Sequence, residues 1–575
     1  MSDGSGTEEE GDDLPFIIYL MASWNALNWI GRGWRFKGRV IERSLLNALV
    51  DLEVPLHSSV MALGLAAGRS LRAAFAPNFQ GFGLRYRSSV RAAAAAEHDL
   101  DVRPTPLKTI QDLPGYGLLT GIYWNILRGY LLKTHELQIV HKEIFGPIWK
   151  SQFGPLIVIN VANAELIEQI LRQEGKYPLR SYMPHWREYR ELRGHAYGPL
   201  CEYGLKWYQM RRMLNPKLLQ PKAVINYAPA INEVVSDFVK KIERLRESQG
   251  DGVTVKDLSN ELYKFAFEAI TMVLFGTRIG CLADNVPQET QNFISAVGEM
   301  FHLSAILIFF PKAMWPYLSI WKKFVKAWDY LFFVAKKLVD KKIAQIEEWR
   351  AQGLPLEDGY LIHLLSNNKM TPIEIYGSLT ELLLAGVDTT SNTISWALYN
   401  LAREASIQDK LYTEISSLHP GEQIPTTSDF SKMPLLKATI KETLRMYPVV
   451  PGNARVTVDK EVVVGDYCFP QNTLFHLCHY AVSYEDCNFA EPQRFKPERW
   501  LESKKQHPFS SIPFGFGLRT CIGKRVAELE MYSVLSTLIN RFEVRPDPSR
   551  KRITAKTRTL LCPGDTMNLQ FIDRR

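Results

Sequence analysis

A cysteine in a glycine-bounded turn is the part of this sequence best suited to hold a metal. Gly517 and Gly523 flank Cys521 and let the backbone bend around the sulfur, so that nearby N–H groups can donate to it. A strong helix-forming run follows, and the positive end of a helix favours a thiolate. Arg519 lies two residues before the sulfur, where it can meet an anionic group of the same cofactor. The run predicts a thiolate-bound metal cofactor; a buried structural cysteine is the simpler alternative.

A second stretch places polar residues inside an apolar helix. The helix is expected to start near Ile373, and it contains Gly386, Asp388 and Thr389. Glycine costs a helix interior roughly 1 kcal/mol relative to alanine, and a buried aspartate costs more unless it is paired. These costs indicate a functional reason for the segment, with a kink in a core helix as the structural alternative.

Two further groups of residues have the spacing of one helix face. Trp207 and Arg211 are four residues apart, so an indole N–H and a guanidinium can grip one anionic group. Glu442 and Arg445 are three residues apart, with Arg499 as a further basic residue downstream. The second group predicts a buried ion network with a structural role.

These residues must be positioned by a mainly helical domain. Apolar residues recur at three- and four-residue intervals in 231–246 and 325–349, as they do in amphipathic helices. Short stretches at 156–161, 456–464 and 553–561 have the composition of strands. The predicted fold class is therefore mainly α with small accessory β-sheets.

Size and charge fit one large catalytic domain with an N-terminal appendage. The 575 residues are 46% hydrophobic and 23% charged, which is ordinary for a folded protein with a sizeable core. The net charge of +8 is spread out, so we expect no nucleic-acid partner and favour a membrane surface or an acidic protein. Seven scattered cysteines without a C-x-x-C pair favour a reducing compartment.

The N-terminal region resembles a targeting segment. An apolar run at 14–30 is short for a membrane anchor. Residues 54–96 contain no Asp or Glu, while arginines alternate with small and apolar residues, as in a mitochondrial presequence. Met61 lies inside this run, and we hypothesise that the native product starts there. The expected organisation is an uncertain leader at 1–60, a presequence and linker at 61–105, and the catalytic domain at 106–575. A flexible linker behind an endoplasmic-reticulum anchor is the alternative.

Together these motifs resemble those of the cytochrome P-450 superfamily, the haem-thiolate monooxygenases. Residues 514–523 fit the cysteine loop F-x-x-G-x-R-x-C-x-G, 385–390 fit A-G-x-D-T-T, and 442–445 fit E-x-x-R. The resemblance covers the chain from about residue 107 to its C-terminus. It implies the cytochrome P-450 fold, haem b as cofactor, and Cys521 as the axial ligand of the haem iron.

The resemblance also implies roles for individual residues. Thr389 would hydrogen-bond the oxygen being activated and Asp388 would relay protons, beside a locally opened helix that makes room for dioxygen. Glu442, Arg445 and Arg499 keep their structural role. The implied haem contacts are Trp207, Arg211, Arg455, Phe514, Arg519 and Gly523. Val449 and Val450 are implied to line the substrate cavity.

Within the superfamily the chain most resembles the mitochondrial sterol 26/27-hydroxylase group, with similar runs at 172–178, 278–282 and 383–393. The implied reaction is hydroxylation of the terminal methyl of a sterol side chain, in sterol and bile acid metabolism. Groups that hydroxylate vitamin D at C1 or C25, or desaturate retinoids, share much of the pattern and stay open. The intact acid–alcohol pair favours oxygen activation over an isomerase, a synthase or a non-catalytic sterol-binding relative. The basic leader speaks against a microsomal drug-type hydroxylase.

Lys437 and Lys441 lie one turn apart on the helix that carries Glu442, and most such pairs are merely solvated. The mitochondrial branch of the family docks an acidic [2Fe–2S] ferredoxin there, and Lys524 and Arg525 would extend the patch. We recognise no flavin or NADPH domain, so the resemblance implies electrons from an NADPH–ferredoxin reductase through the ferredoxin. An aromatic connection at 309–323 is either core or a contact with the matrix side of the inner mitochondrial membrane.

Overall fold

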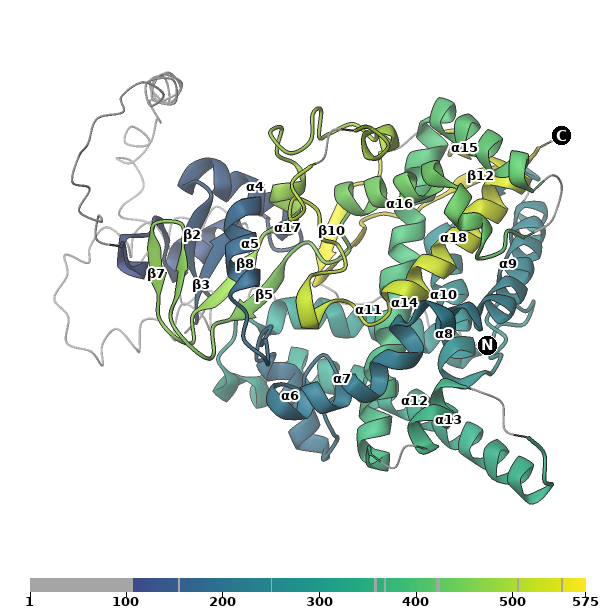
Figure 1. Cartoon of the computed structure of the whole chain (residues 1–575), viewed down its shortest axis with the longest axis horizontal. Helices are drawn as coiled ribbons and strands as arrows, with labels where there is room; N and C mark the ends of the chain where they lie inside the picture. The colour runs from purple at the N-terminus through teal and green to yellow at the C-terminus, as the bar shows by residue number, and fades with distance from the viewer. Residues whose placement is uncertain are drawn as a thin grey trace, which may run out of the picture. The chain divides into compact units, whose positions relative to one another are not determined.

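The apolar segment with polar insertions forms one long helix, α14 (Pro372–Arg403). In this computed structural model, a capping box starts α14: the Glu374 N–H donates to the Thr371 hydroxyl, and the Thr371 N–H donates to the Glu374 carboxylate at 2.9 Å. Most of α14 is buried, because α10 (Leu258–Phe275), α12 (Ser319–Ala351) and α16 (Pro434–Met446) pack around it (Figure 1). The structure describes residues 107–575 except 154–155, 250, 356–358, 367–368, 420–423, 504–505, 550–551 and 575. The leader at 1–60 and the presequence at 61–105 lie outside the described residues.

Helices make up most of the described residues. Beyond the four already given, they are α3 (Leu118–Ile122), α4 (Thr134–Phe145), α5 (Ala164–Arg172), α6 (Pro184–Arg193), α7 (Gly204–Leu219), α8 (Pro221–Ile225), α9 (Ala228–Ser248), α11 (Gln288–Leu307), α13 (Tyr360–Ser366), α15 (Ala405–Leu418), α17 (His479–Ser483) and α18 (Lys524–Arg541). Shorter turns of helix are η2 (Ile110–Asp112), η3 (Tyr123–Leu127), η4 (Lys312–Tyr317), η5 (Asp429–Lys432), η6 (Pro497–Trp500) and η7 (Gly517–Arg519). The helical periodicity at 231–246 and 325–349 falls within α9 and α12, as predicted.

The strands form small, separate sheets. The largest has the order β1-β2-β3-β8-β5, and β4, β12 and β9 form a three-stranded sheet. Two hairpins, β6–β7 and β10–β11, complete the set. The bounds are β1 (Gly115–Tyr116), β2 (Ile148–Phe153), β3 (Leu156–Val161), β4 (Thr254–Val255), β5 (Asn453–Val456), β6 (Val462–Val464), β7 (Tyr467–Phe469), β8 (Leu474–Leu477), β9 (Phe542–Pro546), β10 (Ala555–Arg558), β11 (Leu560–Pro563) and β12 (Leu569–Asp573). The predicted fold class, mainly α with small accessory sheets, is confirmed.

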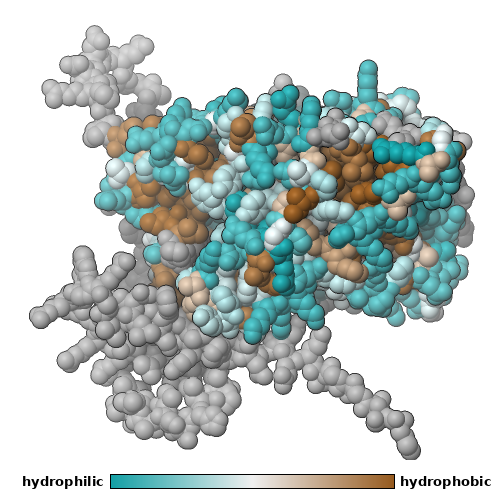
Figure 2. All heavy atoms as spheres, turned by 90° about the horizontal axis from the view of Figure 1, so that it is seen from below, coloured by the Kyte–Doolittle hydropathy of each residue, from teal (hydrophilic) through white to brown (hydrophobic). Residues whose placement is uncertain are grey.

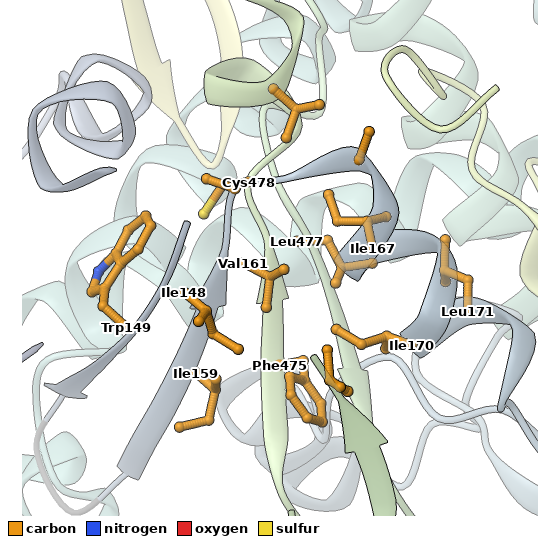
Figure 3. Packing of buried hydrophobic residues seen from close by; sticks show 14 of the residues in the cluster. Ile148, Trp149, Ile159, Val161, Ile167, Ile170, Leu171, Phe475, Leu477 and Cys478 are labelled. Carbon is orange, nitrogen blue, oxygen red and sulfur yellow. The ribbon is translucent and has the colours of Figure 1, made fainter. Parts of the chain in front are cut away.

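The five-stranded sheet has a core of its own, distant in sequence from α14. Ile159 and Val161 of β3 and Phe475 of β8 are fully buried and meet Ile167 and Ile170 of α5 (Figure 3). Residues more than 300 positions apart therefore close one side of the domain, since β3 and β8 pair in parallel. This packing fixes β5, the strand that carries Arg455.

Most aromatic side chains of the connection at 309–323 lie in the core, although its lysines are exposed. Trp315 and Trp321 stack with ring centroids 5.3 Å apart and both are buried, while the Trp315 indole donates to the Phe310 carbonyl at 3.0 Å. Tyr317 is the exception, with 86% of its surface exposed. The two buried tryptophans hold α12 against the turn η4 rather than facing outward.

Candidate active site

The cysteine loop has the shape that its glycines predict. Gly515 and Gly517 take φ values of +72° and +68°, the left-handed region that favours glycine, and η7 follows. The Cys521 N–H then donates to the Phe514 carbonyl at 2.8 Å, and α18 starts just beyond Gly523. Burial raises the pKa of the Cys521 thiol, while the Gly523 N–H and nearby basic side chains act in the opposite direction. The sulfur thus lies at the start of a helix with the Gly523 N–H as a backbone donor, an environment that suits a metal-bound thiolate.

A cavity separates this loop from α14. The loop contributes Cys521, Phe514 and Gly523, and α14 contributes Gly386 and Thr389. Its other walls are largely apolar: Leu218, Ile270, Leu274, Leu382, Ala385, Leu444, Val449 and Val450. The structure therefore brings the predicted iron ligand, the predicted catalytic threonine and the predicted substrate-lining valines to one chamber.

The segment around Thr389 differs from the expectation in one respect. We expected a locally opened helix, but α14 runs without interruption through residues 385–390. The Thr389 hydroxyl donates to the Ala385 carbonyl at 2.7 Å, one turn back. A Cβ at Gly386 would lie only 2.6 Å from a side-chain carbon of Ile270, so this glycine lets α10 approach closely. The glycine is explained by helix packing, without an opened turn.

Asp388 is buried beside Thr389 but is not among the residues that line the cavity. Only 5% of its surface is exposed, and this burial raises the pKa of its carboxyl to about 6. A carboxyl that titrates near neutral pH can both accept and release a proton under working conditions. Asp388 is therefore suited to the proton-relay role implied for it.

Four arginines cluster beside the cavity, and Glu174 is the carboxylate that acts on Arg180 and Arg519 among the described residues. Arg519, Arg211 and Arg455 were predicted there, Arg180 was not, and Glu174 pairs with Arg455. Burial and the other guanidiniums lower the pKa of Arg519 to about 8 and that of Arg180 to about 10. Arg519 satisfies its donors on the carbonyls of residues 178, 199 and 202, and Arg211 donates to the Thr520 carbonyl at 3.0 Å. An anionic ligand would balance this excess of buried positive charge.

Trp207 sits beneath this cluster. Its ring lies 3.6 Å from the guanidinium carbon of Arg519, which is a cation–π contact. Within the described residues, the buried Nε1 of Trp207 and the buried Nε of Arg180 have no hydrogen-bond partner. Orphaned donors beside a surplus of positive charge fit the propionates of a haem whose iron reaches Cys521. The residues present thus fit haem b.

The predicted ion network is assembled as one buried unit. Arg445 makes a bidentate contact with Glu442, through Nε at 2.9 Å and Nη2 at 2.8 Å. Arg499 Nε and Trp500 Nε1 reach the same carboxylate at 3.0 and 2.9 Å. Glu442 and Arg445 have no exposed side-chain surface, and Arg499 has 5%. The network ties α16 to η6.

The predicted docking residues have different surroundings. Lys441 is exposed and lies 5.7 Å from the ring centroid of Trp500, whereas Lys437 is half-buried. Arg525 is exposed and pairs with Glu528 at 3.1 Å. The Lys524 ammonium lies 5.5 Å from the ring centroid of Phe514. Within the described residues, Lys441 makes no ion pair, so its charge is the most available to a partner.

Sequence reasoning missed three charged residues of the chamber, Arg180, Glu381 and Glu530. Glu381 is paired with Arg190 at 3.2 Å. Burial raises the pKa of the Glu530 carboxyl to about 8, and its Oε1 has no partner among the described residues. Glu530 lies on the apolar face of α18, where burying a carboxyl group costs free energy, as it does for Asp388. The reasoning that identified Asp388 could therefore have identified Glu530. Arg180 precedes α6 in an irregular segment, and no periodic signal marks it.

Comparison with known proteins agrees with this geometry. The cytochrome P450 family matches residues 116–571. A mitochondrial sterol 26-hydroxylase of Oryctolagus cuniculus is 44% identical over 475 residues, which cover 81% of this chain and 89% of that protein. The human counterpart is 42% identical, covering 81% and 90%. The human mitochondrial 25-hydroxyvitamin D-1 alpha hydroxylase is also 42% identical, covering 81% and 93%.

The chain belongs to the cytochrome P450 family. The cysteine loop, the buried arginine cluster and the apolar chamber agree with this family. The protein is a haem-dependent monooxygenase and therefore an oxidoreductase.

Proposed function

We propose that the enzyme hydroxylates the terminal methyl of a sterol side chain, at the 26/27 position, using O₂ and electrons from a [2Fe–2S] ferredoxin. The observation that carries the proposal is the apolar chamber between Cys521 and Thr389, which suits a hydrocarbon substrate. Similarity to sterol 26-hydroxylases over four-fifths of the chain favours a sterol among such substrates.

The residues divide the work between binding and proton handling. Cys521 would hold the haem iron, and Trp207, Arg180, Arg211, Arg455 and Arg519 would hold its propionates. Bound haem supplies oxygen activation and oxygen insertion into a C–H bond.

Protein side chains around the haem site exclude water and transfer protons. Val449, Val450 and Ile270 exclude water from the reacting carbon. Thr389 presents a hydroxyl at the cavity wall, and Asp388 moves a proton to or from it. Glu530 of α18, protonated at neutral pH, is a second proton donor in the wall of the chamber.

Reconstitution with two electron donors tests this function. The purified protein would be given a cholestane-type sterol with either a mitochondrial ferredoxin and its reductase or a microsomal flavoprotein reductase, and products would be located by mass spectrometry. We expect terminal-methyl hydroxylation with the ferredoxin pair alone. No sterol product with either donor, despite a normal haem-thiolate spectrum, would overturn the sterol assignment.

A secosteroid is the second candidate substrate. It is favoured by the 42% identity to the human 25-hydroxyvitamin D-1 alpha hydroxylase, which equals the identity to the human sterol 26-hydroxylase. The same assay with 25-hydroxyvitamin D as substrate decides between them, since the ratio of kcat/KM for the two substrates measures the preference.

Ferredoxin docking is assigned to Lys437, Lys441, Lys524 and Arg525. Of these four residues, Lys441 is the one that is exposed and makes no ion pair with a described residue. Lys524 belongs to the helix that follows the Cys521 loop. Electrons would thus arrive on the side of the protein that holds the cysteine loop. Such docking should weaken as salt is raised, because exposed charges are screened.

An apolar surface supports peripheral contact with the matrix side of the inner mitochondrial membrane. Leu119, Tyr123 and Leu127 recur every four residues along α3 and η3, and each is nearly half exposed. α3 lies against β2, and Leu156 and Ile157 of β3 are exposed as well. Figure 2 shows apolar side chains at the end of the molecule where the five-stranded sheet lies, and others toward the opposite end. No helix in the described part of the chain is long and apolar enough to cross a bilayer.

The targeting proposal rests on the acid-free segment within 61–105 and on relatives that are named mitochondrial. Start-site use at Met61 would leave 1–60 out of the native product. Peptide mapping of the endogenous protein tests this, because recovery of peptides from 1–60 would refute it.

A further inference from the structure

Part of the chamber wall is a segment that is neither helix nor strand. Residues 195–203 join α6 to α7, and they contribute Pro199 and Leu200 to the lining of the chamber. Irregular backbone keeps one position only where other groups hold it, because it lacks the hydrogen-bond ladder of a helix or a sheet. The contacts that hold this segment therefore bear on where a substrate lies.

One carboxylate of α14 holds the N–H groups of the segment. Glu381 accepts from the Leu200 N–H at 2.7 Å and from the Gly198 N–H at 3.2 Å. Arg190 of α6 donates to the same carboxylate at 3.2 Å, and neither side chain of this ion pair has exposed surface. The guanidinium carbon of Arg190 also lies 3.7 Å from the ring centroid of Trp328 in α12, a cation–π contact. The ion pair thus joins three helices and fixes the carboxylate that holds the wall.

The carbonyl groups of the same segment are held by the cysteine loop. Arg519 donates to the carbonyls of Pro199 and Glu202 at 3.4 and 3.2 Å. Residues 198–202 therefore lie between an acid of α14 and a guanidinium of the haem site. Arg519 donates to the Pro178 carbonyl as well, at 2.7 Å, so its own position does not depend on the segment alone.

Two glycines bring the segment into direct contact with α14. A Cβ at Gly198 would lie 2.5 Å from the carboxyl carbon of Glu381, and a Cβ at Gly377 of α14 would lie 2.6 Å from the Ala196 carbonyl oxygen. A side chain at either position would push the segment away from the helix. The φ of Gly198 is not positive, so alanine there would meet Glu381 without straining the backbone.

We propose that Glu381 is a positioning residue that determines which carbon is hydroxylated: with Arg190 it fixes residues 198–202 as the wall that orients the substrate. The inference rests on the proposed hydroxylation of a sterol side chain. Glu381 lines the chamber, but its oxygens already accept from backbone N–H groups and a guanidinium, so it acts through Pro199 and Leu200. A shift of about 1 Å in such a wall is enough to misplace the reacting carbon.

Glu381→Gln tests the role, with Glu268→Gln as the matched control. Glu268 of α10 is also fully buried and also holds a loop, accepting from Arg278 at 2.6 Å and from the Cys281 N–H at 2.7 Å, but this loop does not line the chamber. Both variants should lose stability and keep the spectrum of the reduced carbon monoxide complex. In Glu381→Gln alone we expect the substrate KM to rise several-fold and the terminal-methyl share of the products to fall several-fold.

Gly198→Ala displaces the wall without removing a charge, and it serves if Glu381→Gln fails to fold. Its control is Gly298→Ala on α11, where an added Cβ would meet no atom within 4 Å. Spectral titration with imidazole, and with imidazole that carries a long alkyl chain, gives a readout without turnover, because only the alkyl chain reaches the wall. The ratio of the two affinities should change several-fold in Glu381→Gln and Gly198→Ala, at the expense of the alkyl ligand, and stay constant in both controls.

The outcomes distinguish the inference from the function on which it rests. Should the unmodified enzyme give no sterol product, the sterol assignment is wrong, and the affinity ratio still decides whether Glu381 holds the wall. Should the unmodified enzyme hydroxylate the terminal methyl while Glu381→Gln and Gly198→Ala match their controls in product distribution and affinity ratio, the positioning role of Glu381 is overturned and the proposed function stands.

Discussion

Neutralising Glu442 should destabilise the folded enzyme far more than neutralising a chemically identical surface residue. Glu442 accepts from Arg445 twice, from Arg499, from the Trp500 indole, and from the Lys496 N–H at 3.1 Å. In Glu442→Gln one of the oxygens becomes an NH₂ group that faces these donors. Two guanidiniums with little or no exposed surface then lack a counter-charge.

The expected magnitude follows from this burial. Removing one partner of a buried ion pair costs about 3–5 kcal/mol, since the remaining charges stay out of water. Glu491 and Arg494 provide a matched pair with the same i, i+3 spacing and an N···O distance of 3.0 Å, but with side chains 56% and 74% exposed. Exposed pairs of this kind contribute about 0–1 kcal/mol. Glu442→Gln should therefore exceed Glu491→Gln by at least about 2 kcal/mol.

Urea unfolding of the purified holoenzyme measures the difference, with circular dichroism for the helices and haem absorbance for the site. If unfolding is irreversible, the half-time of haem loss at a fixed temperature replaces the midpoint. Two variants that agree within about 0.5 kcal/mol would refute the view that the network bears on stability. Both probes should shift together in Glu442→Gln, because α16, the helix that carries Glu442, also lines the cavity through Leu444.

Three shorter predictions concern the chamber and its surface. Thr389→Ala should release peroxide and lower product per NADPH, whereas Ser395→Ala, a hydroxyl further along α14, should not. Trp207→Phe keeps a ring under Arg519 but removes the orphaned N–H, so haem transfer to apomyoglobin should quicken several-fold while Trp321→Phe leaves it unchanged. Lys441→Gln should raise the ferredoxin KM at low salt, with the difference vanishing at high salt; an equal effect at all salt concentrations would argue against docking there.

Sequence predicted those parts of the site whose reasons are local. The cysteine loop could be found because its glycines, its basic residue and its following helix lie within a dozen residues. The Glu442–Arg445 pair could be found because three residues is one turn of helix. Asp388 and Thr389 stood out because polar residues are costly in an apolar helix.

The error at Gly386 shows where local reasoning ends. A glycine in a helix was correctly identified as needing a cause, and family resemblance supplied one, an opened turn. The structure shows a different cause, the side chain of Ile270 from a helix more than 100 residues earlier in the chain. Sequence can reveal that a side chain is missing for a reason, but not which neighbour occupies the space.

The arginine cluster shows why Arg180 escaped prediction, whereas Arg211, Arg455 and Arg519 could be named as haem contacts only through the family resemblance. Arg180, Arg211, Arg455 and Arg519 come from four separate segments, and each alone resembles an ordinary surface arginine. Only together do they form a buried group of positive charges, in which burial and the neighbouring guanidiniums lower the pKa of Arg519 and Arg180. Such a surplus opposes folding until anions bind, so haem propionates held by these arginines would stabilise the fold as well as the site. The pocket would then be completed by its cofactor, and the residues proposed to bind haem most specifically are those that only the folded chain brings together.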